Sequence, residues 1–320
     1  MKIKDIMGLA VDEGIAVDPR GRDTIERILS ENREKYDKLD PGEKEIFDTH
    51  VLESPFADSR ILNGDPEADI SEAWVGIDVD TSELLLVKSI AGKRESFPLV
   101  ISHHPLGRAY ANFYEVMDMQ ADILESMGVS ASVADNLTRN RKAEVARKVS
   151  GSNHFRAQDA AKLLGINVMN IHTPADNHVK KYLADLLEKE KPYRIKDLID
   201  ILMSIDEYRI SAKNGQPPHI LTGNESNRCG KIFVDMTGGT EGSSELIEKL
   251  VDSGVSTVVG MHMSDKHYNA AKDVNMNVII AGHISSDNLG LNLLLDKIVS
   301  RLGELEIIEF SGFNRVSRNG

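Results

Sequence analysis

The chain has 320 residues, of which 41% are hydrophobic and 28% charged, and its formal net charge is −13. These proportions are typical of a folded protein with a sizeable core, and no stretch approaches the ~20 apolar residues of a membrane span. The negative charge repels polyanions and no dense Lys/Arg cluster offsets it, so we expect neither nucleic acid nor a membrane as a partner.

Two further features of the composition narrow the chemistry and the location. The first residues lack the apolar segment of a secretory signal, so the cytoplasm is the expected location. Cys229 is the single cysteine, which excludes an internal disulfide and a thiolate metal cage. Any metal must therefore be held by nitrogen and oxygen donors.

Charged helices are predicted for residues 1–50, where apolar residues recur at helical spacing. We expect this segment to be a helical arm appended to the fold. A first α/β lobe is predicted over 51–195, in which VGIDVD (75–80) and LLLVKSI (84–90) are expected to be neighbouring strands. The segment FPLVISHHPLG (97–107) is predicted to be a buried strand that runs into a polar turn.

Helical patterns fill most of residues 109–165, and the strand INVMNIH that follows ends on His172. The prolines and glycines near residue 195 suit a connection, so a second lobe is predicted over 196–320. There strands and helices alternate in a βαβαβ order, which indicates a mainly parallel sheet. The expected fold is therefore α/β, with two lobes of mainly parallel sheets and an N-terminal helical arm.

Two stretches of the chain resemble each other. AAKLLGINVMNIHTPADN begins at Ala160 and AAKDVNMNVIIAGHISSDN begins at Ala270, and both end His-x-x-x-Asp-Asn. The similarity favours two related halves that offer their strand ends to one cleft. Chance likeness between short α/β units is the alternative.

Histidines follow three of the most apolar predicted strands, and two of them precede an aspartate by four residues. Ligands of open α/β sheets gather outside the carboxyl ends of strands, so these donors suit a site for two divalent metal ions. On a continuing strand His103 and His104 would point to opposite faces, which favours two ions over one. The alternative is that the histidines and aspartates only cap turns and helices. The three segments hold the candidate residues His103, His104, His172, Asp176, His283 and Asp287, and five nitrogen or oxygen donors among them suit such a site.

Other candidates are weaker. His267 starts a predicted helix and can be either a proton carrier facing the cleft or a surface cap. His262 ends an apolar strand and is a lesser candidate, whereas the remaining histidines are expected to be structural or on the surface. The Gly-rich turn 237–244 joins a strand to a helix and can hold an anion, although it lacks the Gly-Lys-Ser/Thr of a P-loop.

In this order, SHHPLG, HTPAD, GGTEGSS, KHYNAA and GHISSD resemble the motifs of the NIF-three-like proteins, over about residues 74–312. Some members of that family bear the name GTP cyclohydrolase I type 2. The resemblance implies a dinuclear site with His172 close by, and a homo-oligomer built from trimers, often a hexamer. It implies as metal ligands His103, His104, Asp176, His283 and Asp287.

The chain departs from the family pattern in three ways. Asp287 replaces the usual glutamate, the segment between HHPLG and HTPAD is longer by a helix or two, and the arm before residue 50 is an addition. The extra helices and the arm are expected to reshape the mouth of the cleft or the oligomer.

The leading hypothesis is a hydrolase with two Zn, Fe, Mn, Co or Ni ions that share Asp287 or Asp176 and activate water. His172 or His267 would carry protons, and the Gly-rich turn would hold the phosphate of a small nucleotide-like substrate such as GTP. The alternative is a non-catalytic metal reservoir, chaperone or regulatory adaptor. A solvent-open site favours the enzyme, and a closed one favours the alternative.

Overall fold

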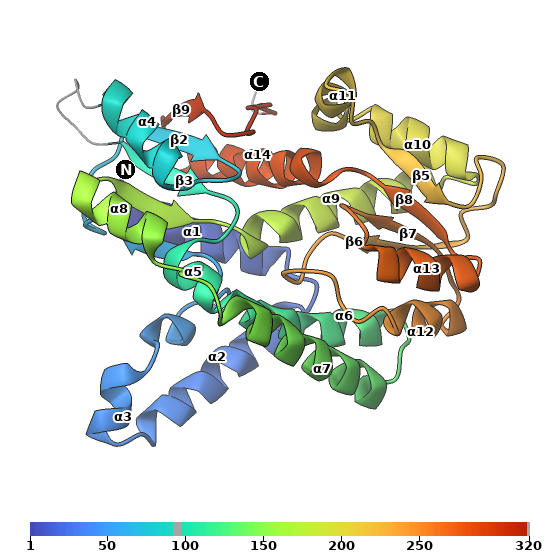
Figure 1. Ribbon diagram of the computed structural model, residues 1–320, viewed down its shortest axis with the longest axis horizontal. Coiled ribbons are helices and arrows are strands. Elements are labelled where there is room, and N and C mark those ends of the chain that lie inside the picture. Colours follow the sequence, from blue (N-terminus) through green and yellow to red (C-terminus); the bar gives the residue numbers. More distant parts are fainter. Residues whose placement is uncertain (92–97, 319–320) are drawn as a thin grey trace.

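The computed structural model describes residues 1–91 and 98–318 and shows an α/β protein whose described part contains two sheets (Figure 1). In spatial order, the first sheet consists of β1 (Arg60–Asn63), β4 (Asn167–Asn170), β3 (Leu99–Ser102), β2 (Glu72–Gly76) and β9 (Glu306–Glu309). The second consists of β5 (His219–Thr222), β8 (Asn277–Ile280), β7 (Val255–Gly260) and β6 (Lys231–Asp235). All neighbours are parallel except β1 with β4 and β5 with β8. The predicted α/β class with mainly parallel sheets is confirmed.

The two sheets repeat one topology. The order β1-β4-β3-β2 in the first matches β5-β8-β7-β6 in the second, with the same strand directions. Even the irregularity at the antiparallel edge recurs, between Ile61 and Asn63 and between Ile220 and Thr222. The internal similarity found in the sequence is therefore a repeat of structure.

The helices α9 (Thr173–Glu190) and α14 (His283–Leu302) pack against each other between the sheets (Figure 1). Apolar residues of α14 such as Leu291 join the core of the first sheet, and those of α9 such as Leu183 join the core of the second. Each helix begins directly after a strand of its own half, so the first turns of both helices lie at sheet edges. This pair of first turns positions the site described below.

The other helices cover the outer faces. Helices α4 (Thr81–Ala91), α5 (Gly107–Ala111) and α8 (Arg156–Leu164) contribute to the core on the outer face of the first sheet. Helices α6 (Met119–Ser126), α7 (Ala131–Val149), α12 (Leu246–Asp252) and α13 (Asp265–Asp273) do the same for the second sheet. Helices α10 (Ile195–Met203) and α11 (Asp206–Lys213) pack beside α9 and α14, and two 3-10 helices span Thr49–Leu52 and Phe113–Asp118.

Three expectations for the first half of the chain are corrected. The run LLLVKSI forms part of helix α4 instead of a strand, because Leu84 and Val87, three residues apart, face the core while the residues between them face outwards.

Helix α1 (Ile3–Ala16) is not part of an arm, since its apolar face is buried in the first core. Only α2 (Arg22–Asp37) and α3 (Pro41–Ile46) project from the body (Figure 1). Strand β2 covers only the first part of VGIDVD, and Phe97, at the start of the predicted FPLVIS strand, lies outside the described residues.

The expected division near residue 195 separates the strands of the two sheets except for β9, which pairs with β2. Helices α6 and α7 precede residue 195 but pack on the second sheet. The chain therefore crosses between the halves more often than a single boundary implies. Within the described residues, no helix combines the length and apolarity that a bilayer crossing requires.

Candidate metal centre

Strands β3, β4 and β8 each deliver a histidine to one point between the sheets. His103 directly follows β3, and its backbone N–H still donates to the carbonyl of Gly76, which keeps it at the sheet edge. His172 follows β4, and Pro174 in the first turn of α9 favours the start of the helix there. Gly282, at φ 113°, allows the chain to turn from β8 directly into α14 at His283.

Asp287 lies at the centre of these histidines. Its Oδ1 is 3.4 Å from Nε2 of His103, while its Oδ2 is 3.4 Å from Nε2 of His104 and 3.6 Å from Nε2 of His283. The two oxygens of one carboxylate thus face different imidazoles. Asp176 supplies the second carboxylate, with Oδ1 3.5 Å from Nε2 of His103.

His103 and His104 converge on one carboxylate, contrary to the expectation that they point to opposite faces. The reason is that β3 ends at Ser102, so the alternation of a strand no longer applies to the pair. Their ring centroids are 5.4 Å apart. The structure therefore brings together all five residues predicted as ligands, and His172 with them.

Among the residues that the structure describes, the atoms that face one another in this cluster have no hydrogen-bond partner. Buried polar side-chain atoms without a partner include Nε2 of His103, Nε2 of His104, Oδ1 of Asp176 and Oδ2 of Asp287. Such atoms are rare because leaving one unpaired costs about 1–3 kcal/mol. Metal coordination would satisfy all four. Two groups of donor atoms, within 4.8 Å of one another in each, consist of His103, His172 and Asp176 and of His103, His104 and Asp287.

The opposite ring nitrogens are held by the protein. Nδ1–H of His103 donates to the carbonyl of Ile171 at 3.1 Å, and that of His104 donates to Oδ1 of Asp78 at 2.7 Å. Nδ1–H of His172 donates to the buried Asp58 at 2.7 Å. Metal-binding histidines are oriented in this way, with one nitrogen fixed by a carbonyl or carboxylate and the other free for the ion. The donor set therefore fits divalent metal.

Burial and charge set the protonation of these groups. Burial lowers the pKa of His103 to about 4 despite the nearby Asp287. Burial raises the pKa of Asp176 to about 8. It would lower that of His172, but the carboxylates of Asp176 and Asp58 outweigh burial and raise this pKa to about 9. Although burial opposes it, His103, His104 and His283 hold the pKa of Asp287 far below its usual range.

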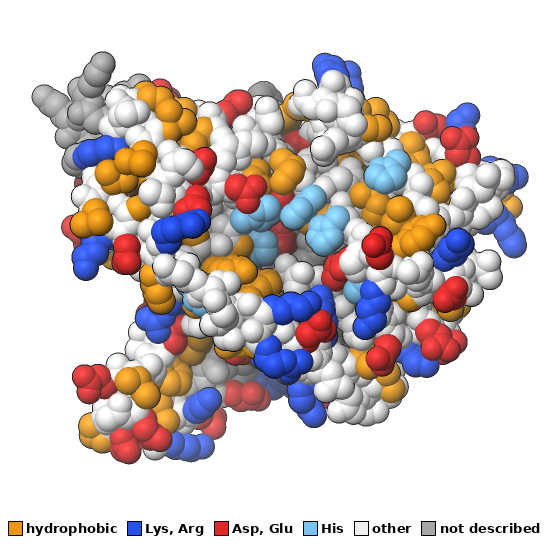
Figure 2. All heavy atoms as spheres, viewed as in Figure 1, with side chains coloured by type: hydrophobic (Ala, Val, Ile, Leu, Met, Phe, Trp, Pro, Cys, Tyr) orange, Lys and Arg blue, Asp and Glu red, His pale blue; other side chains and the backbone are white. Residues whose placement is uncertain are grey.

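The cluster opens on one side. A cavity of about 70 Å³ lies against Asp176, His283 and Asp287. Its wall includes Glu241 and His262 from the second half of the chain. The side chain of His283 is 40% exposed, whereas that of Asp287 is 1% exposed. Figure 2 shows histidine side chains gathered in a hollow near the centre of this face. His262, the lesser candidate, contacts His283 edge to face, with ring centroids 4.9 Å apart and an angle of 60° between the ring planes.

The structure places His267 away from the cluster. Its Nδ1 lies 2.9 Å from Oγ of Ser264, and Nε2–H donates to the carbonyl of Gly242 at 3.1 Å. Both ring nitrogens are thus engaged beneath the Gly-rich turn, which Gln120 also holds through the carbonyls of Gly238 and Thr240. His267 positions this turn and has no nitrogen directed into the cavity.

Asp58 and Asp78, which hold two of the histidines, were not predicted from the sequence. Asp58 lies in an irregular segment before β1, and Asp78 follows the end of β2. Neither shows a motif or a fixed spacing to its histidine. Only the tertiary fold brings each pair together.

Neither a family model nor a curated protein matches the chain. Among solved structures, the chain is similar to a NIF3 superfamily protein from Sphaerobacter thermophilus, with 26% identity and a TM-score of 0.68 over 80% of this chain and 91% of that one. Reduced HcgD from Methanocaldococcus jannaschii follows, with 16% identity and a TM-score of 0.48 over 78% and 87%. A Bacillus cereus protein related to NIF3 has 11% identity and a TM-score of 0.40, over 79% of this chain and 91% of that one.

Proposed function

The chain belongs to the NIF3-like family, and on this premise we propose that it holds two divalent metal ions and uses them to hydrolyse a small polar substrate. The observation that carries the proposal is the set of four buried, unpartnered donor atoms that converge on one point. The nitrogen and oxygen donors suit Zn, Fe, Mn, Co or Ni.

The distances suggest how the donors divide between two ions. His103 and Asp176 would hold the first ion, and His104 and His283 the second. Asp287 would contribute to holding both, because its Oδ1 faces His103 and its Oδ2 faces His104 and His283. We place His172 with the first ion as a further nitrogen donor, since its Nε2 lies 3.7 Å from Oδ2 of Asp176 and its Nδ1 is fixed by Asp58.

Bound there, the ions would supply Lewis acidity and lower the pKa of water for attack on the substrate. The exposure of His283 beside the cavity supports catalysis, because a purely structural site is closed by protein ligands. Asp235 and Glu241 line the cavity and repel free anionic groups. These carboxylates would accept hydrogen bonds from ring N–H or amino groups, which supports a nucleotide-like substrate whose phosphate is held elsewhere.

A second candidate function is favoured by the size of the cavity. At about 70 Å³ it admits a reacting group but not a whole nucleotide. A non-catalytic protein that stores, delivers or senses metal would need no larger space. This candidate shares the metal site with the first and differs only in turnover.

The test is anaerobic purification with metal quantification, followed by a screen of nucleotides and phosphoesters. We expect about two ions per chain, loss of metal in His103→Ala and Asp287→Ala, and hydrolysis only by the metal-loaded parent chain. His219→Ala is the matched control, because His219 is exposed on the edge strand β5. Undiminished hydrolysis by Asp287→Ala would contradict the hydrolase. Metal binding without turnover of any compound would support the second candidate.

A further inference from the structure

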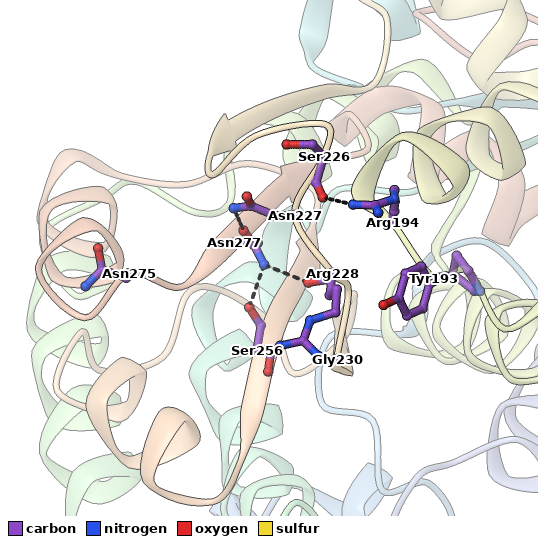
Figure 3. A pocket seen from close by; sticks show the side chains of 10 residues that line it. Tyr193, Arg194, Ser226, Asn227, Arg228, Gly230, Ser256, Asn275 and Asn277 are labelled. Atoms are coloured by element: carbon purple, nitrogen blue, oxygen red, sulfur yellow. Dashed lines mark hydrogen bonds between the residues drawn. The ribbon is translucent and has the colours of Figure 1, made fainter.

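A second cavity, of about 980 Å³, lies far from the metal centre (Figure 3). Ser256 and Asn277 line it from the amino ends of β7 and β8, whereas the metal centre lies beyond the carboxyl end of β8. Segments 192–194 and 226–230 form the remaining wall. The volume lies in the range of small-molecule sites.

Two arginines project into this cavity from paired backbone segments. Arg194 and Arg228 form an antiparallel β-bridge, which the hydrogen bond from the Cys229 N–H to the Tyr193 carbonyl extends. Residues directly opposite each other in such a bridge project to the same side, and like charges there are destabilising. Figure 3 shows both arginines at the cavity together with Tyr193.

Within the described part of the chain, neither arginine side chain has a carboxylate within ion-pair distance. The described cavity wall contains no aspartate or glutamate, and within residues 1–91 and 98–318 neither guanidinium forms an ion pair. The Arg194 guanidinium donates to the carbonyl of Ser226, and the Asp197 carboxylate accepts from the backbone N–H of Arg194 and not from its guanidinium. In a chain of net charge −13, two arginines on opposite sides of a β-bridge would be expected to have carboxylate partners for their guanidinium groups. Such a local conflict is expected mainly at functional positions. A bound anion would relieve their repulsion.

The rest of the wall is preformed and suits a planar ring. Asn277 accepts a hydrogen bond from Asn227 at 2.8 Å and donates to the carbonyl of Ser256 at 3.2 Å, which ties the 226–230 segment to the strands. The Arg194 guanidinium lies over the ring of Tyr193, 5.4 Å from its centroid, and Tyr193 is 61% exposed, so much of the ring remains open to a ligand. Asn275 adds an amide to the wall. Aromatic side chains of this kind stack on nucleobases.

We propose that this cavity binds a phosphate monoester that carries a planar ring, as in a nucleoside monophosphate. Arg194 and Arg228 would hold the phosphate, Tyr193 would stack on the ring, and the asparagines would bond its polar edge. The site is independent of the metal centre and of the proposed hydrolysis.

Calorimetric titration of the full chain tests the proposal, after chelation has removed metal that would itself bind phosphate. The probes are AMP, adenosine and inorganic phosphate. For the double variant Arg194→Gln/Arg228→Gln we expect at least a tenfold loss of affinity for AMP and phosphate, and for Tyr193→Leu a loss for AMP but not for phosphate. Arg209→Gln is the control, because Arg209 is an exposed arginine of α11 whose ion pair among the described residues is with Asp206. Unchanged AMP affinity in the double variant, or no saturable AMP binding, would overturn the proposal.

Two further measurements separate the site from its alternatives. At low ionic strength the double variant should melt at a higher temperature than the parent, and phosphate should raise the melting temperature of the parent alone. A structural role of the arginines predicts the reverse order. AMP affinity should also persist in Asp287→Ala, and its loss there would assign the binding to the metal centre instead.

Discussion

His172 and Asp58 form a buried pair in which Nδ1 of the imidazole lies 2.7 Å from Oδ2 of the carboxylate. Asp58 is fully buried and also accepts hydrogen bonds from the hydroxyls of Thr173 and Ser59. The carboxylate therefore fixes the His172 ring, so that its Nε2 faces Asp176. An asparagine at position 58 would keep the shape but lose this control of the tautomer.

Asp58→Asn is expected to lower metal affinity by roughly 10–100-fold, the usual effect of removing a group that orients a ligand histidine. Competition with a chelating dye measures the affinity. Asp78→Asn is the matched control, since Asp78 holds His104 at the same 2.7 Å but its side chain is 73% exposed and water can replace it. Equal losses in the two variants would show that burial of the partner does not matter.

The contact between α9 and α14 depends on Gly290. A Cβ at this position would lie 2.4 Å from the backbone oxygen of Ala175, next to Asp176. Gly290→Ala is therefore expected to push the two helices apart, lowering the free energy of unfolding by about 1–3 kcal/mol. Metal affinity should fall as well, because the helices carry Asp176 and Asp287. Urea denaturation and dye competition measure the two effects.

Gly8→Ala is the control for that substitution. Gly8 also lies inside a helix, α1, but nothing stands within 4 Å of the position of its Cβ. Here the better helix propensity of alanine should raise stability by up to about 1 kcal/mol. Destabilisation by both substitutions would mean that the close approach at Gly290 is not the cause.

The core of the site was predictable because local geometry creates it. A residue at the start of a helix and one four positions later lie on the same face, so His-x-x-x-Asp after a strand places both donors together. This holds for His172 with Asp176 and for His283 with Asp287. Asp58 and Asp78 were not predictable, since only the packing of loops onto strand ends brings them to the histidines.

The wrong predictions about the fold also concern features that local sequence patterns do not reveal. In the run at 84–90 the exposed positions are apolar except for Ser89, which hides the helical period of α4, and Leu85, Leu86 and Ile90 remain about half exposed. Helix α1 was assigned to an arm because its charged neighbours α2 and α3 dominate the segment. The pairing of β9 with β2 brings together residues more than 200 positions apart, which no local pattern indicates.

Metal removal should destabilise the protein strongly. The metal-free form leaves four buried donor atoms without partners, and an ion satisfies them only in the folded state. With free metal at about 1,000 times its dissociation constant, the expected stabilisation is about 4 kcal/mol. Scanning calorimetry with and without chelator measures it. His103→Ala should melt at a temperature that chelator does not change, and a chelator-sensitive melting temperature in this variant would contradict the ligand role.

Metal binding should also release protons and strengthen as pH rises from about 7 to 9. In the metal-free form burial raises the pKa of Asp176 to about 8, and Asp176 and Asp58 raise that of His172 to about 9 against the effect of burial. Below these values the pair retains protons that an ion must displace, so the metal-free state binds more protons than the loaded state and affinity increases with pH. His103, with a pKa of about 4, contributes none at pH 7.

Each displaced proton should change the affinity about tenfold per pH unit in this window, with little further change above it. Calorimetry in buffers of different ionisation enthalpy counts the protons directly. An asparagine at position 176 cannot carry the proton that Asp176 carries. The metal affinity of Asp176→Asn, although lower, should therefore depend less steeply on pH. If metal binding to the parent chain released no protons at pH 7, other groups would set the charge of the site. An equally steep pH dependence of affinity in Asp176→Asn would show the same.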